Sequence, residues 1–167
     1  TKGESSLVVS VIDAGVENHE DLNDNSGNSR VLGGIRLNPD NTNPSDWIGG
    51  GTPVVNGSGH GQWCAGIIAA SHNDKGGAGI APNVRIFPVN RESRTTTRDI
   101  YVRYEEIAEA ITRSWQAGAS VINMSIGVGS SSESSHSPVI EAAIDQAKTQ
   151  GRGGRGTVLV ASIGNNN

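Results

Sequence analysis

The chain has 167 residues and a formal net charge of −4, and its length suits a single domain spanning 1–167. With one cysteine it can form neither an internal disulfide nor a multi-cysteine zinc site. The acidic balance disfavours nucleic acid as a partner, and no apolar run reaches the roughly 18 residues that a membrane-spanning helix needs. Aromatic residues make up only 4% of the chain and there are 23 glycines, so Val, Ile, Leu and Ala must supply the core.

Short apolar, β-branched runs alternate along the chain with segments of helical periodicity. The pattern predicts buried strands at 7–12, 84–89, 120–124 and 157–161. It predicts helices at 60–71, 98–117 and 138–150. Pro88 predicts the end of its strand or an edge of the sheet. Strands that alternate with helices are typical of an α/β fold with a mostly parallel sheet and helices on both faces.

Residues 23–59 differ from the rest of the chain. Asn, Asp, Gly, Ser and Pro dominate this segment, and these are the residues of turns and loops. The composition predicts a long polar excursion on the surface, built around a short strand at 31–35.

Three polar residues come directly after predicted strands: Asp13, Ser125 and Asn165. In a parallel α/β sheet the ligand crevice lies at the carboxyl ends of the strands, so these residues are candidates for a site. His60 begins a predicted helix between two glycines, which let another part of the chain approach the imidazole closely. A histidine held by an aspartate supplies the base and its orienting group in nucleophilic catalysis. Each residue alone is more often a cap or a structural side chain.

Five segments carry a resemblance to a known family. They are 11–16 (VIDAGV), 60–66 (HGQWCAG), 79–82 (GIAP), 121–127 (VINMSIG) and 161–165 (ASIGN). In this order and at these spacings they resemble the subtilisin-like serine proteases, the subtilases, over nearly all of 7–165. The resemblance makes residues 1–167 the amino-terminal portion of one subtilase catalytic domain. The resemblance implies the subtilisin-like fold and hydrolysis of peptide bonds through an acyl-enzyme, by a secreted or otherwise extracytoplasmic enzyme.

Position by position, the resemblance makes Asp13 the triad carboxylate, His60 the general base and Asn165 the side-chain donor of the oxyanion hole. The family's nucleophile motif, Gly-Thr-Ser-x-Ala, does not occur in these 167 residues. By this mechanism the chain alone should therefore be inactive. We expect a complementary chain or segment to carry the catalytic serine.

Ser125, Ile126 and Gly127 resemble the edge segment that binds the extended polypeptide substrate of these proteases, a role that needs free backbone groups and little side-chain bulk. Cys64, four residues after the histidine, resembles the cysteine of the kexin-like and other thiol-containing branches. The simpler interpretation is a small apolar residue packed beside the helix. Ala14, after the aspartate, departs from the residues that the family commonly has there.

Asp21 and Asn73 resemble, in position, ligands of a calcium site found in many subtilases, and oxygen ligands suit Ca²⁺. The sequence around Asn73 is equally typical of an ordinary turn. Two other functions stay open. One is a catalytically silent subtilase-like module that binds peptides or a partner subunit. The other is a doubly wound nucleotide-binding domain, which is disfavoured because Gln62 stands where the dinucleotide fingerprint needs its third glycine.

Overall fold

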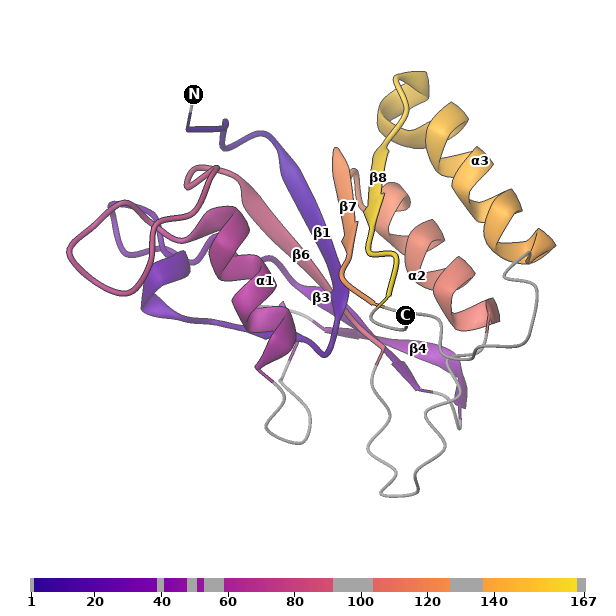
Figure 1. Ribbon diagram of the computed structural model, residues 1–167, viewed down its shortest axis with the longest axis horizontal. Coiled ribbons are helices and arrows are strands. Elements are labelled where there is room, and N and C mark those ends of the chain that lie inside the picture. The colour runs from indigo at the N-terminus through magenta and orange to yellow at the C-terminus, as the bar shows by residue number, and fades with distance from the viewer. Residues whose placement is uncertain are drawn as a thin grey trace.

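The computed structural model describes residues 2–38, 41–47, 51–52, 59–91, 104–126 and 137–164. Its centre is a six-stranded sheet in the order β4-β3-β6-β1-β7-β8 (Figure 1). The strands are β1 (Val8–Asp13), β3 (Gly34–Asn38), β4 (Asn41–Trp47), β6 (Arg85–Asn90), β7 (Val121–Met124) and β8 (Val158–Ala161). Neighbours from β3 to β8 are parallel, and the edge strand β4 is antiparallel to β3. The predicted α/β fold is confirmed.

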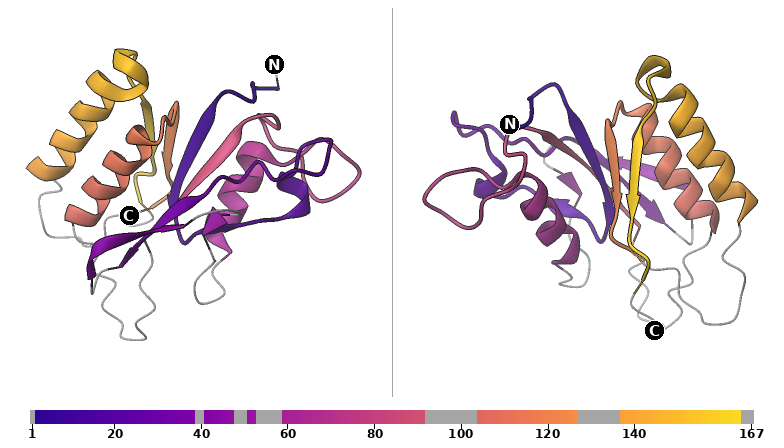
Figure 2. Two further views of the ribbon diagram at one scale, coloured as in Figure 1. Left: turned by 180° about the vertical axis from the view of Figure 1, so that it is seen from behind. Right: turned by 45° about the horizontal axis from the view of Figure 1, so that its top comes forward.

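Helices cover both faces of this sheet. α1 (His60–Ala69) lies on one face, and α2 (Tyr104–Gln116) and α3 (Pro138–Gly154) lie side by side on the other (Figure 2). A second, two-stranded sheet pairs β2 (Val16–Glu17) with β5 (Gly51–Thr52), and a 3-10 turn, η1 (Glu20–Leu22), follows β2. Among the helices that the structure describes, none has the length and apolar character needed to cross a membrane.

The side chains of β1 alternate between two apolar clusters. Val8 and Ile12 belong to the cluster under α2 and α3, whereas Val9 and Val11 belong to the cluster under α1. Successive residues of a strand point to opposite faces, so Asp13 follows Val9 and Val11 onto the α1 face. The alternation of β1 therefore places a carboxylate at the end of the strand, directed toward the start of α1.

The predicted helix ends hold for α2 and α3, whereas α1 ends at Ala69, before the predicted residue 71. α2 ends at Gln116, before Gly118, whose φ of 81° is the left-handed conformation that commonly follows a helix. The predicted first residues of this helix, 98–103, lie outside the described residues. α3 begins at Pro138, as predicted, and its backbone leaves helical dihedrals at Gly151. Arg152 then adopts a φ of 54°.

The prediction that Pro88 marks a strand end or an edge is wrong. β6 lies inside the sheet between β3 and β1, and Pro88 is paired with Val11. Proline lacks an N–H, so it needs a place where the ladder requires no donor. Between Val31 and Ile35 the pairing with β6 slips by one residue, which leaves an irregular stretch opposite Pro88. Gly34 allows the two backbones to approach closely there.

The polar segment 23–59 holds more regular structure than predicted. The strand expected at 31–35 forms at Gly34–Asn38, and Val31 contributes an isolated bridge instead. The chain then returns as β4, which pairs antiparallel with β3 at the edge of the sheet. An edge strand needs backbone hydrogen bonds to one neighbour only, so the polar residues of β4 suffice although they show no apolar alternation.

Candidate active site

Asp13 ends β1 with a buried carboxylate, whose side chain is 4% exposed. Its Oδ1 accepts a hydrogen bond of 2.7 Å from the backbone N–H of Ala14. A carboxylate removed from water in this way needs further donors or a cation to remain charged. His60 supplies that partner.

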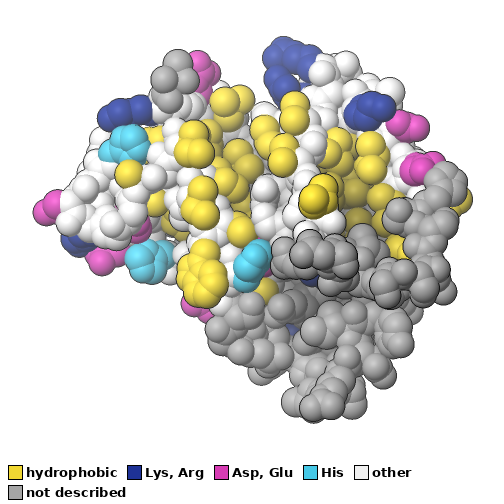
Figure 3. All heavy atoms as spheres, viewed as in Figure 1, with side chains coloured by type: hydrophobic (Ala, Val, Ile, Leu, Met, Phe, Trp, Pro, Cys, Tyr) yellow, Lys and Arg dark blue, Asp and Glu magenta, His cyan; other side chains and the backbone are white. Residues whose placement is uncertain are grey.

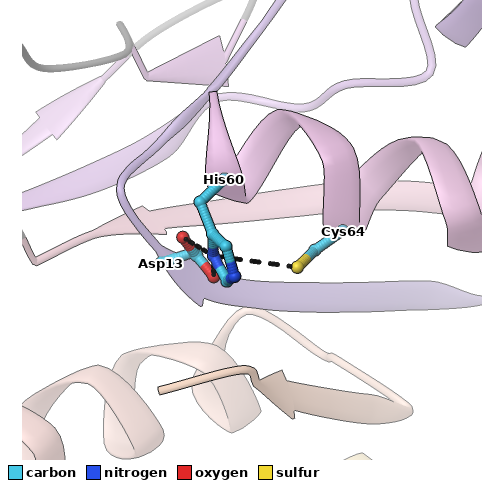
Figure 4. A group of neighbouring side chains, drawn as sticks. All are labelled: Asp13, His60 and Cys64. Carbon is cyan, nitrogen blue, oxygen red and sulfur yellow. Dashed lines mark hydrogen bonds and ion pairs between the residues drawn. The ribbon is translucent and has the colours of Figure 1, made fainter. Parts of the chain in front are cut away.

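His60 is the first residue of α1, and its ring lies against Asp13 (Figure 4). Nδ1 is 2.9 Å from each carboxylate oxygen of Asp13. The histidine side chain is half exposed, so the carboxylate faces the protein and the imidazole faces the surface. When Nδ1 keeps its proton and donates a hydrogen bond to the carboxylate, the neutral ring carries its lone pair on Nε2. The pair is thus a base with an orienting acid that stabilises the imidazolium.

Gly61 makes this contact possible. A Cβ at this position would lie closer than 3.0 Å to the carbonyl oxygen of Gly15, and 3.0 Å from the Cβ of Asp13. The start of α1 therefore touches the chain just after β1 with no room for a side chain. Gln62 adds a second connection, because its Oε1 accepts a hydrogen bond of 2.8 Å from the backbone N–H of Glu17.

Cys64 lies one helical turn after His60, and its Sγ is 4.0 Å from the Nδ1 of that histidine. The side chain of Ser125 lies near enough to the thiol to affect its pKa. Burial raises the pKa of Cys64, and this outweighs the effect of Ser125, which lowers it. The thiol is therefore protonated at neutral pH and is not an activated nucleophile.

This arrangement brings Ser125, from the end of β7, to the same place as Asp13 and His60. Asn123 donates a hydrogen bond of 3.0 Å to the hydroxyl of Ser125, and the carbonyl of Ile126 accepts one of 2.8 Å from Ser162. Sequence reasoning did not predict the contact between Cys64 and Ser125, because it joins segments 61 residues apart through the fold alone. Gly127 and Asn165, which the sequence also placed at this site, lie outside the described residues.

Asp21 lies in η1, and the loop that follows α1 surrounds its carboxylate. Oδ2 accepts a hydrogen bond of 3.1 Å from the N–H of Gly77, whereas Oδ1 is buried and has no hydrogen-bond partner among the described residues. A buried carboxylate oxygen without a donor fits a bound cation. Asn73 lies in the same loop, with its side-chain oxygen accepting a hydrogen bond of 2.9 Å from the N–H of Lys75. A turn bond of this kind leaves one lone pair of that oxygen for a ligand.

Comparisons with known proteins match nearly the whole chain. The model of the subtilase family, peptidase S8, matches residues 4–167. A thermophilic serine proteinase from Bacillus sp. (strain AK1) is 33% identical over 99% of this chain and 35% of its own length. Alkaline elastase YaB from Bacillus sp. (strain YaB) is 32% identical over 94% of this chain and 33% of its own length.

Solved structures agree in fold. Fervidolysin from Fervidobacterium pennivorans, a keratinolytic enzyme related to subtilisin, matches with a TM-score of 0.70 and 27% identity, over 98% of this chain and 22% of its own. The protease domain of PatA matches with a TM-score of 0.67 at 22% identity, which concerns the fold alone. The chain spans about a third of the length of the first two curated relatives.

Proposed function

Because this chain belongs to the subtilase family of serine proteases, we propose that it supplies the aspartate and the histidine of a serine endopeptidase that hydrolyses peptide bonds through an acyl-enzyme. The observation that carries the proposal is the double contact of 2.9 Å between the Nδ1 of His60 and the buried carboxylate of Asp13. A buried acid bound to a half-exposed imidazole is the arrangement that a nucleophilic hydroxyl needs beside it.

In the proposed reaction, Nε2 of His60 takes the proton of a serine hydroxyl as its oxygen attacks the scissile carbonyl. The same nitrogen then returns the proton to the leaving amine, and a water molecule repeats the cycle on the acyl-enzyme. Asp13 holds the ring in the productive tautomer throughout. Asn165 is the proposed amide donor to the oxyanion, since a neutral donor stabilises developing charge without adding a titrating group.

The substrate of this enzyme is a polypeptide in extended conformation. We assign Ser125, Ile126 and Gly127 as the segment that binds its backbone, and the position of Ser125 beside the histidine supports this. The relatives include proteins named extracellular proteases, which supports a secreted or extracytoplasmic location for this one.

The catalytic serine comes, in this proposal, from a chain or segment outside these 167 residues. Support comes from the apolar surface near the outer strand of the sheet: Val158 and Val160 of β8 are 56% and 52% exposed, and Ile163 is fully exposed. Trp63 and Ile67 of α1 are also exposed, and Figure 3 shows apolar side chains across the face between α1 and β8. A surface of this kind marks an interaction site. A segment that covers it would bring its serine toward His60.

Calcium is the proposed structural ion, held by Asp21 through its unpartnered Oδ1, with Asn73 as a further oxygen donor. Bound Ca²⁺ would neutralise the buried carboxylate and join η1 to the loop after α1. We expect the melting temperature of the protein to rise with added Ca²⁺ and to fall with a chelator. The effect should be lost in Asp21→Asn, and an equal calcium response in that variant would refute the site.

An activity-based fluorophosphonate probe tests the protease proposal. In the complete protein, with every chain present, the probe should label a serine that lies outside these 167 residues. Labelling should disappear in His60→Ala and persist in His72→Ala, which removes a surface histidine. If no chain is labelled in a folded preparation, the proposed catalysis is wrong and the protein is a silent peptide-binding module.

A further inference from the structure

The thiol of Cys64 completes a set of three ligand groups around one point. The ligand atoms of Asp13, His60 and Cys64 all lie within 4.8 Å of one another (Figure 4). Among the described residues this is the one group of three His, Cys, Asp or Glu side chains gathered so closely. The mechanism uses the acid and the imidazole, and it assigns no task to the sulfur.

We propose that Asp13, His60 and Cys64 bind a thiophilic divalent cation of the zinc class, and that this binding reversibly switches off the general base. Sulfur, imidazole nitrogen and carboxylate oxygen are the ligands that Zn²⁺ takes in proteins. Water can supply the fourth position of a tetrahedral ion. The metal site stands on the geometry alone, whereas its effect on catalysis rests on the proposed protease function.

The distances are close to those that the ion requires. Tetrahedral Zn²⁺ with bonds of about 2.0–2.3 Å holds its ligand atoms about 3.4–3.6 Å apart. Sγ of Cys64 is 4.0 Å from Nδ1 of His60, and the nearest Asp13 oxygens are 2.9 Å from that nitrogen. Both separations from Nδ1 differ from the required ones by roughly half an ångström. The sulfur and the Asp13 oxygen lie within 4.8 Å of each other, so they would approach by at most about 1.2 Å, through rotation of their side chains, to seat the ion. The half-exposed imidazole leaves the site open to a hydrated cation.

Binding changes the protonation of the site in a defined way. The thiol proton leaves to solvent, and the sulfur binds the metal as a thiolate. The proton of Nδ1 moves to Nε2, because the metal now occupies the Nδ1 lone pair. Nε2 then carries a hydrogen and cannot accept the proton of a serine. The hydroxyl of Ser125, which lies near the sulfur, would stabilise the thiolate by donating a hydrogen bond to it.

A spectroscopic titration tests the site without any assay of activity. Cadmium added to the chelator-treated, complete protein should produce the ultraviolet charge-transfer absorption of a cadmium–thiolate bond, saturating at one equivalent. Cys64→Ser keeps the size of the side chain and removes the soft ligand, so the band should vanish, as it should in Cys64→Ala. His60→Ala should weaken binding by at least about 100-fold, because the loss of a group that only hydrogen-bonds to a metal ligand already costs ~10–100-fold.

His72→Gln is the matched control. It removes a different histidine, in the loop that follows α1, and should leave the cadmium band unchanged. Absence of the band in the unaltered protein would overturn the proposal. An equal band in Cys64→Ser would overturn it as well, because the ion would then lie elsewhere.

The rate of peptide hydrolysis measures the effect of metal binding on the general base. Zn²⁺ should inhibit hydrolysis by the complete protein, and a chelator should restore the rate. The Cys64→Ser variant should need a Zn²⁺ concentration at least about 100-fold higher for the same fractional inhibition, measured against its own metal-free rate. A protein that shows the cadmium band but never hydrolyses peptides supports the metal site and refutes the protease proposal. If zinc inhibits the unaltered protease and its Cys64→Ser variant equally, the metal site is refuted and the protease proposal stands.

Discussion

Replacement of Gly61 by alanine should damage both the fold and the catalytic pair. The added Cβ would lie closer than 3.0 Å to the carbonyl oxygen of Gly15, a separation that real Cβ atoms essentially never show. It would also press on the Cβ of Asp13, 3.0 Å away. Since both neighbours are backbone or the first atom of a side chain, α1 itself must move. Overpacking of this kind costs about 1–3 kcal/mol of unfolding free energy.

Gly66→Ala provides the matched control on the same helix. A Cβ at Gly66 would meet no described atom within 4 Å, and its backbone is helical. This substitution should raise the unfolding free energy by about 0.5–1 kcal/mol through helix propensity alone. Urea unfolding of the complete protein, extrapolated to water, measures both effects.

The same pair of variants separates stability from activity. A displacement of about 1 Å at the catalytic histidine can cost ~10²-fold in turnover, so Gly61→Ala should lose activity even at temperatures where it is fully folded. Gly66→Ala should keep it. If both alanines change stability and peptide hydrolysis alike, the close approach of α1 to Gly15 does not position His60.

Three further predictions concern buried polar groups. Asp13→Asn should lower the rate of hydrolysis by ~10⁴-fold. The amide NH₂ can donate to Nδ1, which places the ring proton on Nε2, and the neutral amide does not stabilise the imidazolium. Steady-state kinetics that show a rate within tenfold of the parent would contradict the assigned role. Ser10→Ala and Ser114→Ala should each lower the unfolding free energy by about 1–3 kcal/mol, because their buried hydroxyls lie 2.7 Å apart and hydrogen-bond to each other. A double-mutant cycle should show that the two losses are coupled, and strictly additive losses would exclude the coupling. Alkylation of Cys64 by iodoacetamide should rise with pH through a midpoint above the value of about 8.5 for a free cysteine, because burial raises the pKa of this thiol and removes thiolate at neutral pH; a midpoint at or below that value would show an activated thiol instead.

Much of the fold followed from local pattern. The run of Val8 to Ile12 is buried on both faces and apolar except for Ser10, as suits a strand covered by helices on both sides. Its alternation directs Asp13 toward α1. α2 and α3 end where glycine allows a left-handed backbone or a break in the helix. These features depend on neighbours in the chain, so the sequence carries them directly.

Pattern failed where pairing with a distant segment decided the outcome. Pro88 looks like a strand end because its own backbone lacks a donor, yet it lies inside the sheet, opposite an irregular stretch that needs none. β4 carries no apolar alternation and forms because β3 offers it backbone partners. In both cases the deciding hydrogen bonds are made with another strand. Its pairing register cannot be read from the residues next to Pro88 or within β4.

The amino-acid sequence by itself determined which residues could carry chemistry: an acid at the end of a buried strand, a histidine at the start of a helix, and the glycine after it. Only the tertiary structure decided that both oxygens of the acid meet Nδ1 at 2.9 Å, and that a thiol and the Ser125 hydroxyl join them. The reason is physical. Residue type follows from the chain, whereas a hydrogen bond needs two groups, 47 residues apart here, to be held within a few tenths of an ångström by everything packed around them.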